Sequence, residues 1–137
     1  DPESASPPGE QLPLATNAQA ACGRYFEWDL FRSTQLPGAQ RANKQARRVA
    51  LKDFAQLASR TASSVDSAVT VGDLPSRARL AANRIARILS RLVKGGGDVS
   101  GVPGRVARDL AGPSARLEAQ CAAGGFALPE ANRDARG

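Results

Sequence analysis

The segment from Asp73 to Gly97 constrains the fold more than any other part of this chain. Asp73 and Pro75 are typical of a helix start and the glycines from Gly95 onward of a helix end, so the segment predicts one helix of about 20 residues. Apolar residues recur along it at helical spacing and share one face: Ala78, Ala81, Ala82, Ile85, Ile88, Leu89 and Leu92. A helix with one apolar face buries that face against other helices.

The remaining surface of the same segment is strongly basic. It has no acid between Leu74 and Gly97 and carries six cations, which are Arg77, Arg79, Arg84, Arg87, Arg91 and Lys94. The whole chain has 19 Lys and Arg against 13 Asp and Glu, a formal net charge of +6. The other 13 cations therefore balance the 13 acids, and the net positive charge of the protein belongs to this segment.

A second basic helix is expected to run from just after Gly38 to Val71. Its N-terminal half carries five cations where the helix dipole disfavours them, namely Arg41, Lys44, Arg47, Arg48 and Lys52. The short connection to Leu74 predicts that this helix and the next are antiparallel neighbours, with Arg48 and Lys52 level with Arg91 and Lys94. A solvated basic face and a docking surface for an anionic partner explain this pattern equally well.

Two further helices complete a predicted all-α fold, an up-and-down four-helix bundle over residues 16–124. The first runs from Thr16, which forms a capping box with Gln19, to about Ser33. The last begins near Val99 and is expected to be kinked where Gly112 and Pro113 interrupt it. Residues 1–15 are Pro-rich and are expected to form an extended arm, and residues 125–137 a loose, flexible tail.

Two features of the first helix predict tertiary contacts. Asp29 lies within its apolar arc and is expected to pair with an Arg or a backbone donor, because an unpaired buried carboxylate is too costly. Cys22 and Cys121 are expected to form a disulfide that makes the first and last helices neighbours, and the alternative is two separate buried thiols. A disulfide would place the protein in an oxidising, extracytoplasmic compartment.

The composition argues against catalysis. The chain contains no histidine, which removes the usual general base, the usual zinc ligand and the usual partner of a Ser or Cys nucleophile. The glycine-rich run at 95–101 follows a helix and lacks the Lys-Ser/Thr of a phosphate loop, so it is interpreted as a linker. We therefore expect no enzyme activity, no cofactor and no metal site, and no transmembrane segment, although peripheral attachment to a membrane complex stays open.

Binding through the basic surface is the expected function. The predicted site is a set of seven residues that would dock onto an acidic protein surface of a larger complex: Arg48, Lys52, Arg77, Arg84, Arg87, Arg91 and Lys94. The alternative is a basic nucleic-acid or polyanion binder. Against that alternative stand the expected disulfide and the lack of aromatics interleaved with basic residues, of a helix-turn-helix and of a zinc pattern.

Two segments resemble the PsbQ-like lumenal extrinsic proteins of photosystem II. GDLPSRARLAANRIARILSRLV at 72–93 is similar to the acidic turn and Arg/Leu-rich third helix of that family, and VARDLAGPSARLEAQCAAG at 106–124 to its last helix. The resemblance implies a non-catalytic four-helix bundle that docks its Lys and Arg residues onto a membrane complex in the thylakoid lumen. A small exported cell-envelope protein of a high-GC bacterium, secreted or periplasmic, fits the same Ala/Arg/Gly composition.

Overall fold

The structure, a computed structural model, describes residues 16–137. Its secondary structure over that range is entirely helical, which confirms the predicted all-α class. Its elements are α1 (Thr16–Thr34), α2 (Leu36–Gln40), α3 (Lys44–Thr70), α4 (Ser76–Lys94), the 3-10 helix η1 (Val99–Gly101), α5 (Arg105–Ala123) and α6 (Glu130–Arg136). The Pro-rich segment 1–15, predicted as an extended arm, lies outside the described residues.

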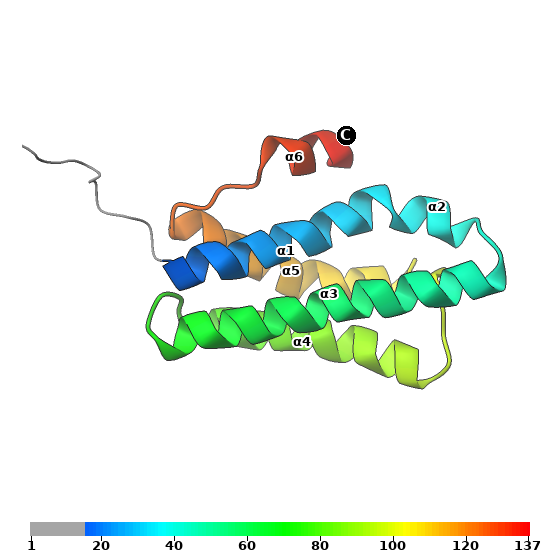
Figure 1. The fold of residues 1–137 in the computed structure, drawn as a ribbon, viewed down its shortest axis with the longest axis horizontal. Coiled ribbons are helices and arrows are strands. Elements are labelled where there is room, and N and C mark those ends of the chain that lie inside the picture. The colour runs from blue at the N-terminus through cyan, green and yellow to red at the C-terminus, as the bar shows by residue number, and fades with distance from the viewer. Residues whose placement is uncertain (1–15) are drawn as a thin grey trace, which may run out of the picture.

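The four long helices α1, α3, α4 and α5 lie side by side, and the chain reverses direction from each one to the next (Figure 1). α1 packs against α3, α3 against α4, α4 against α5, and α5 returns to α1. α2 and η1 lie together at one end, where both contact α3. This order leaves α4 bordered by two neighbours, so a groove follows each of its sides.

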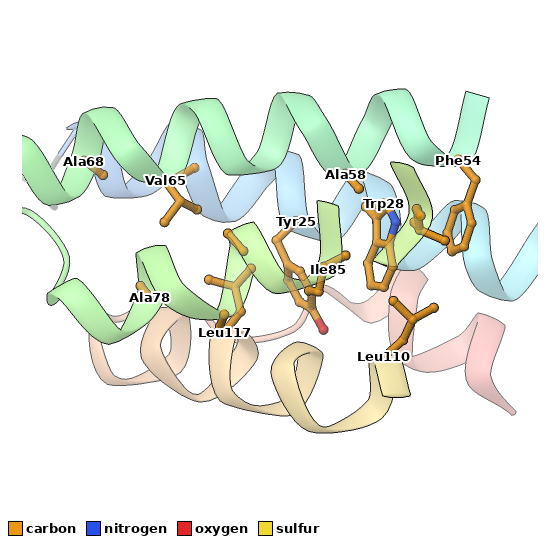
Figure 2. Packing of buried hydrophobic residues seen from close by; sticks show 14 of the residues in the cluster. Tyr25, Trp28, Phe54, Ala58, Val65, Ala68, Ala78, Ile85, Leu110 and Leu117 are labelled. Atoms are coloured by element: carbon orange, nitrogen blue, oxygen red, sulfur yellow. The ribbon is translucent and has the colours of Figure 1, made fainter. Parts of the chain in front are cut away.

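Aromatic side chains from α1 and α3 form the centre of the core (Figure 2). Trp28 stacks on Phe54 with ring centroids 5.1 Å apart, and Phe31 stacks on the same phenylalanine at 5.6 Å. Phe31 remains partly exposed. α4 buries the predicted face, with Ala78, Ala81, Ala82, Ile85 and Leu89 fully covered and Ile88 and Leu92 partly covered.

The second predicted helix begins later than expected. Residues Leu36–Gln40 form the separate helix α2, and the side chain of Asn43 then caps α3 by accepting a hydrogen bond from the Ala46 N–H at 2.9 Å. Asn is among the strongest N-cap residues, which explains why the chain breaks here. Arg41 therefore belongs to a connection, while Arg48 and Lys52 remain on α3.

The last long helix also begins later than predicted and continues without interruption. Val99 belongs to η1, and Gly104 adopts φ 77 before α5 begins at Arg105. The structure shows α5 as one helix through Gly112 and Pro113. A proline inside a helix removes one backbone hydrogen bond. Here that bond would go to the carbonyl oxygen of Asp109, which is an exposed residue.

The predicted loose tail is wrong for residues 130–136, which form α6 against α1 (Figure 1). Asn132 is buried and donates hydrogen bonds to the carbonyl oxygen of Phe26 at 2.8 Å and to Asp29 Oδ2 at 3.0 Å. The helix has no large apolar side chain, so an apolar pattern could not predict it. Polar contacts hold the segment in place, and the folded unit extends beyond residue 124.

Candidate docking surface

Helix α4 carries five basic residues on one flank of the buried face and on the side opposite to it. Arg77, Arg84 and Arg91 follow one another at seven-residue intervals, and so do Arg87 and Lys94, which aligns each set along one side of the helix. All five residues are exposed. The face that contains Ile85 and Leu89 is buried, so the packing of α4 turns its cations outward.

Arginines from two helices line the groove between α4 and α5, which has a volume of about 680 Å³. Its cations are Arg77, Arg84 and Arg87 of α4 and Arg108 and Arg116 of α5. Asp109 is the only acid among the lining residues, and its carboxylate lies 3.9 Å from Arg105 Nε. We call this feature the arginine groove.

The centre of the arginine groove is apolar and is lined mostly by small residues. Ala81, Gly112 and Pro113 line it, together with Leu80, which is 69% exposed and thus the most exposed large apolar side chain of the described residues. A single exposed leucine is common on protein surfaces, but here arginines border it, and an apolar contact within a polar rim is typical of interaction sites.

A second groove, of about 780 Å³, lies between α3 and α4. Small side chains line most of it, and its cations are Lys52 of α3 and Arg87 of α4. Asp66 at the same groove is paired with Arg79, whose Nε lies 2.7 Å from the carboxylate. Arg87 lines both grooves and connects the two surfaces.

The structure brings the seven predicted binding residues together only in part. Arg77, Arg84 and Arg87 line the arginine groove, and Lys52 lines the α3–α4 groove with Arg87. The other three predicted residues, Arg48, Arg91 and Lys94, are exposed on α3 and α4 but line neither groove.

Two arginines of this surface escaped prediction. Arg108 and Arg116 belong to α5, which was predicted as a helix but not as part of the site. The available signal was their eight-residue spacing, which places both on one side of α5 with Gly112 midway between them. Only the packing of α5 against α4 decides that this side faces Arg77 and Arg84.

Within residues 16–137, neither the seven predicted residues nor Arg108 and Arg116 form an ion pair with an acidic side chain. Other cations are paired: Arg47 with Asp98 at 3.3 Å, for example. Unpaired cations that share one face add their fields and attract anionic partners. The charge of the arginine groove is therefore available for binding.

A different set of charges is buried between α1, α5 and α6. The carboxylate of Asp29 is fully covered and accepts hydrogen bonds from Arg32 at 2.7 Å, Arg136 at 2.9 Å and Asn132 at 3.0 Å. Arg136 also donates to Glu118, which accepts a further bond from the Tyr25 hydroxyl at 3.1 Å. These residues form the Asp29 cluster, and the predicted pairing of Asp29 with an arginine is confirmed.

The Asp29 cluster shifts the pKa of its members in opposite directions. Burial alone would raise the pKa of Asp29, but the hydrogen bonds from Asn132, Arg136 and Arg32 outweigh it and hold this pKa below its ordinary value. Burial, followed by the charge of Glu118, raises the pKa of Tyr25. The carboxylate is therefore ionised and the phenol protonated at neutral pH, which suits a structural network.

The predicted disulfide is also confirmed. Cys22 of α1 and Cys121 of α5 are bonded, with Cα atoms 5.8 Å apart and a sequence separation of 99. The bond lies on the same side of the protein as the Asp29 cluster, since both join α1 to α5. It fastens the segment that leads into α6.

The described residues offer binding chemistry in the arginine groove. Among residues 16–137, no group of three or more His, Cys, Asp or Glu side chains is arranged to hold a metal ion. None of the helices in this range has the length and apolar character needed to cross a membrane. A comparison of the chain with protein-family models, curated proteins and solved structures gives no match.

Proposed function

We propose that this protein is a non-catalytic, extracytoplasmic accessory protein, an up-and-down four-helix bundle that docks onto an acidic protein surface of a larger complex. The arginine groove carries the proposal. It combines five arginines with one acid around an exposed leucine, and its cations have no acidic partner among the described residues. Lys52 and the other predicted cations of α3 and α4 extend the same positive surface.

The apolar centre favours a protein over nucleic acid as partner. Protein interfaces typically surround an apolar contact with a polar rim, and arginine is enriched at their strongest contacts. The exposed Leu80 supplies apolar surface in the arginine groove. The planar guanidinium group also matches a carboxylate with two parallel hydrogen bonds. A phosphate backbone would use the arginines but not the leucine.

The disulfide supports a location outside the cytoplasm, because such bonds persist in oxidising compartments. The resemblance to the PsbQ-like proteins extends the proposal to one compartment and one partner, the thylakoid lumen and photosystem II. The other location within the proposal is a bacterial cell envelope, with the protein secreted or periplasmic.

Charge reversal in and beside the groove tests the proposal. We expect Arg84→Glu/Arg87→Glu/Arg91→Glu to abolish capture of a partner from native membranes, because like charges would face its acidic surface. Arg41→Glu/Lys44→Glu/Arg60→Glu is the matched control, since it changes the charge by the same amount at exposed positions outside both grooves. Equal capture by both variants would refute the proposal.

A gel shift with arbitrary duplex DNA tests the alternative, which is a basic nucleic-acid or polyanion binder. Because both kinds of binding weaken with salt, the comparison must be made at one ionic strength near 0.15 M. Duplex binding stronger than partner binding, and lost in the same groove variant, would identify a polyanion binder instead.

A further inference from the structure

We infer that the arginine groove receives one helix of the partner, and that this helix carries two acidic residues seven positions apart with apolar residues between them. The inference rests on the proposed function and names the element that the partner presents. It follows from the spacing of the arginines, from the kind of backbone that lines the groove, and from its apolar centre.

Four of the five arginines can be grouped by the end of the groove at which they lie, and Arg87 follows Arg84 by three positions on α4. Because α4 and α5 are antiparallel (Figure 1), Arg77 lies at the same end as Arg116, and Arg84 at the same end as Arg108. Seven positions separate Arg77 from Arg84 on α4, and eight separate Arg108 from Arg116 on α5. At about 1.5 Å per residue the two ends are thus roughly 10 to 12 Å apart.

A helix matches this spacing along a single face. Positions i and i+7 of a helix point to nearly the same side and lie about 10.5 Å apart, which is the separation of the arginine pairs. Positions i+3 and i+4 fall between them on that side. Acidic residues at i and i+7 would meet the two arginine pairs, and apolar residues at i+3 and i+4 would cover Leu80.

The walls of the groove also favour a helix over an extended segment. Both walls are helices, whose backbone N–H and C=O groups bond within the helix and present no edge for a strand. An extended segment would leave its own backbone groups unpaired wherever the groove buries them, whereas a helix satisfies them internally.

Gly112 keeps the centre of the groove open to such a helix. A Cβ atom placed there would meet only Nη2 of Arg116, at 3.7 Å, which is an ordinary van der Waals contact with the end of a flexible side chain. The residue is inside α5 and its side of the helix is exposed. Residues without large side chains allow a second helix to approach closely. Gly112 is thus the position at which shape can be tested without a change of charge.

Synthetic peptides test the spacing directly. The probe is an alanine-based helical peptide with Glu at i and i+7 and Leu at i+3 and i+4, titrated against the full chain by fluorescence anisotropy. The matched peptide has the same composition with the second Glu moved to i+5, about 140° around the helix. We expect the moved charge to weaken binding about tenfold, as for the loss of one hydrogen-bonded charge pair.

Protein variants test the groove with the same i, i+7 peptide. Gly112→Leu should also weaken binding at least tenfold by filling the centre, while the better helix propensity of leucine maintains the fold. Gly112→Ala, which adds only the tolerated Cβ atom, should be stable and bind within about threefold of the unchanged chain.

Arg108→Gln tests the charge of the groove with the same peptide and should weaken binding about tenfold. Arg60→Gln, which is outside the arginine groove, should leave binding unchanged.

The outcomes separate this inference from the proposed function. Equal binding of the two peptides, or undiminished binding by Gly112→Leu, would overturn the helix inference even if the partner is still captured through the groove. Tighter binding of a Pro-spaced extended peptide with the same acids would also overturn it. If no acidic peptide binds and charge reversal leaves partner capture unchanged, the proposed function itself is wrong.

Discussion

Arginine has opposite roles in the Asp29 cluster and in the arginine groove. In the cluster, Arg32 and Arg136 converge on one fully buried carboxylate, and Arg136 also pairs with Glu118. In the groove, five arginines from α4 and α5 share one acid, and that acid lies nearest to Arg105. One region satisfies its charges within the fold, and the other leaves them facing outward.

The difference shows which charges the fold needs. A buried carboxylate must be paired because its desolvation is costly, so the Asp29 cluster contributes to stability only when complete. Exposed arginines contribute little to stability with or without partners. The comparison predicts that changes near the disulfide and Asp29 unfold the protein or release α6, while changes in the groove leave the fold intact and affect binding.

Removal of the disulfide should have the largest effect on stability. The bond closes a loop of 99 positions, and the chain-entropy relation assigns a loop of this length about 4 kcal/mol or slightly more. We expect Cys22→Ala/Cys121→Ala to lower the free energy of unfolding by about that amount in urea denaturation. A loss below about 1 kcal/mol would mean that packing alone holds α1 against α5.

Asp29→Ala should have the next largest effect and lower the free energy of unfolding by about 3 kcal/mol. We take the lower end of the range for broken buried pairs because the side chains of Arg32 and Arg136 are 26% and 37% exposed and can regain water. Hydrogen exchange should show faster exchange in residues 130–136, since Asn132 and Arg136 lose their shared acceptor. Asp109→Ala is the control, because its carboxylate is exposed and should change stability by less than about 0.5 kcal/mol.

Acidification should also lower the free energy of unfolding, but by less than Asp29→Ala does. The native pKa of Asp29 is held below its unfolded value, so the ionised carboxylate contributes stability above about pH 4 and loses it as the pH falls through the native pKa. The pKa of Asp98 is also lowered, by Ser100 and then by Arg47. We therefore expect the free energy of unfolding to fall below about pH 4. In Asp29→Asn this decrease should be shallower, because only the contribution of Asp98 remains.

The groove variant should have the smallest effect on stability. Arg84→Glu/Arg87→Glu/Arg91→Glu replaces three exposed residues, each expected to change the free energy of unfolding by about 0.5 kcal/mol or less. Thermal unfolding of the same preparation used for partner capture is the measurement. Collapse of the fold would show that these arginines are structural, and the distinction between the two regions would then fail.

Sequence patterns predicted the features that depend on local periodicity. The buried face of α4 is the clearest case, because apolar and basic residues alternate there with the period of one helix. The partner class of Asp29 was also predictable, since its position in an apolar arc requires a donor. The break before α3 carried a local signal, the Asn43 cap, which the periodicity argument overlooked.

Such patterns could not predict helix α6 or the α5 side of the arginine groove. The residues of α6 have no apolar periodicity, and the helix is held by hydrogen bonds to Asp29 and Phe26, more than 100 positions away. Arg108 and Arg116 lie on an ordinary exposed side of α5. Nothing local indicates that this side borders α4, because the rotation of one helix against another is set by the packing of both.

The sequence by itself determined the helical class, the basic character of α4 and the residues that must be buried. These follow from the order of residues within one helix, where each turn fixes the direction of every side chain. The tertiary structure alone decided which cations share a surface, because Arg77 and Arg116 become neighbours across a groove only when α4 and α5 pack antiparallel. It also decided which arginines are neutralised, since the acids that pair with Arg32 and Arg136 come together only when α1, α5 and α6 meet.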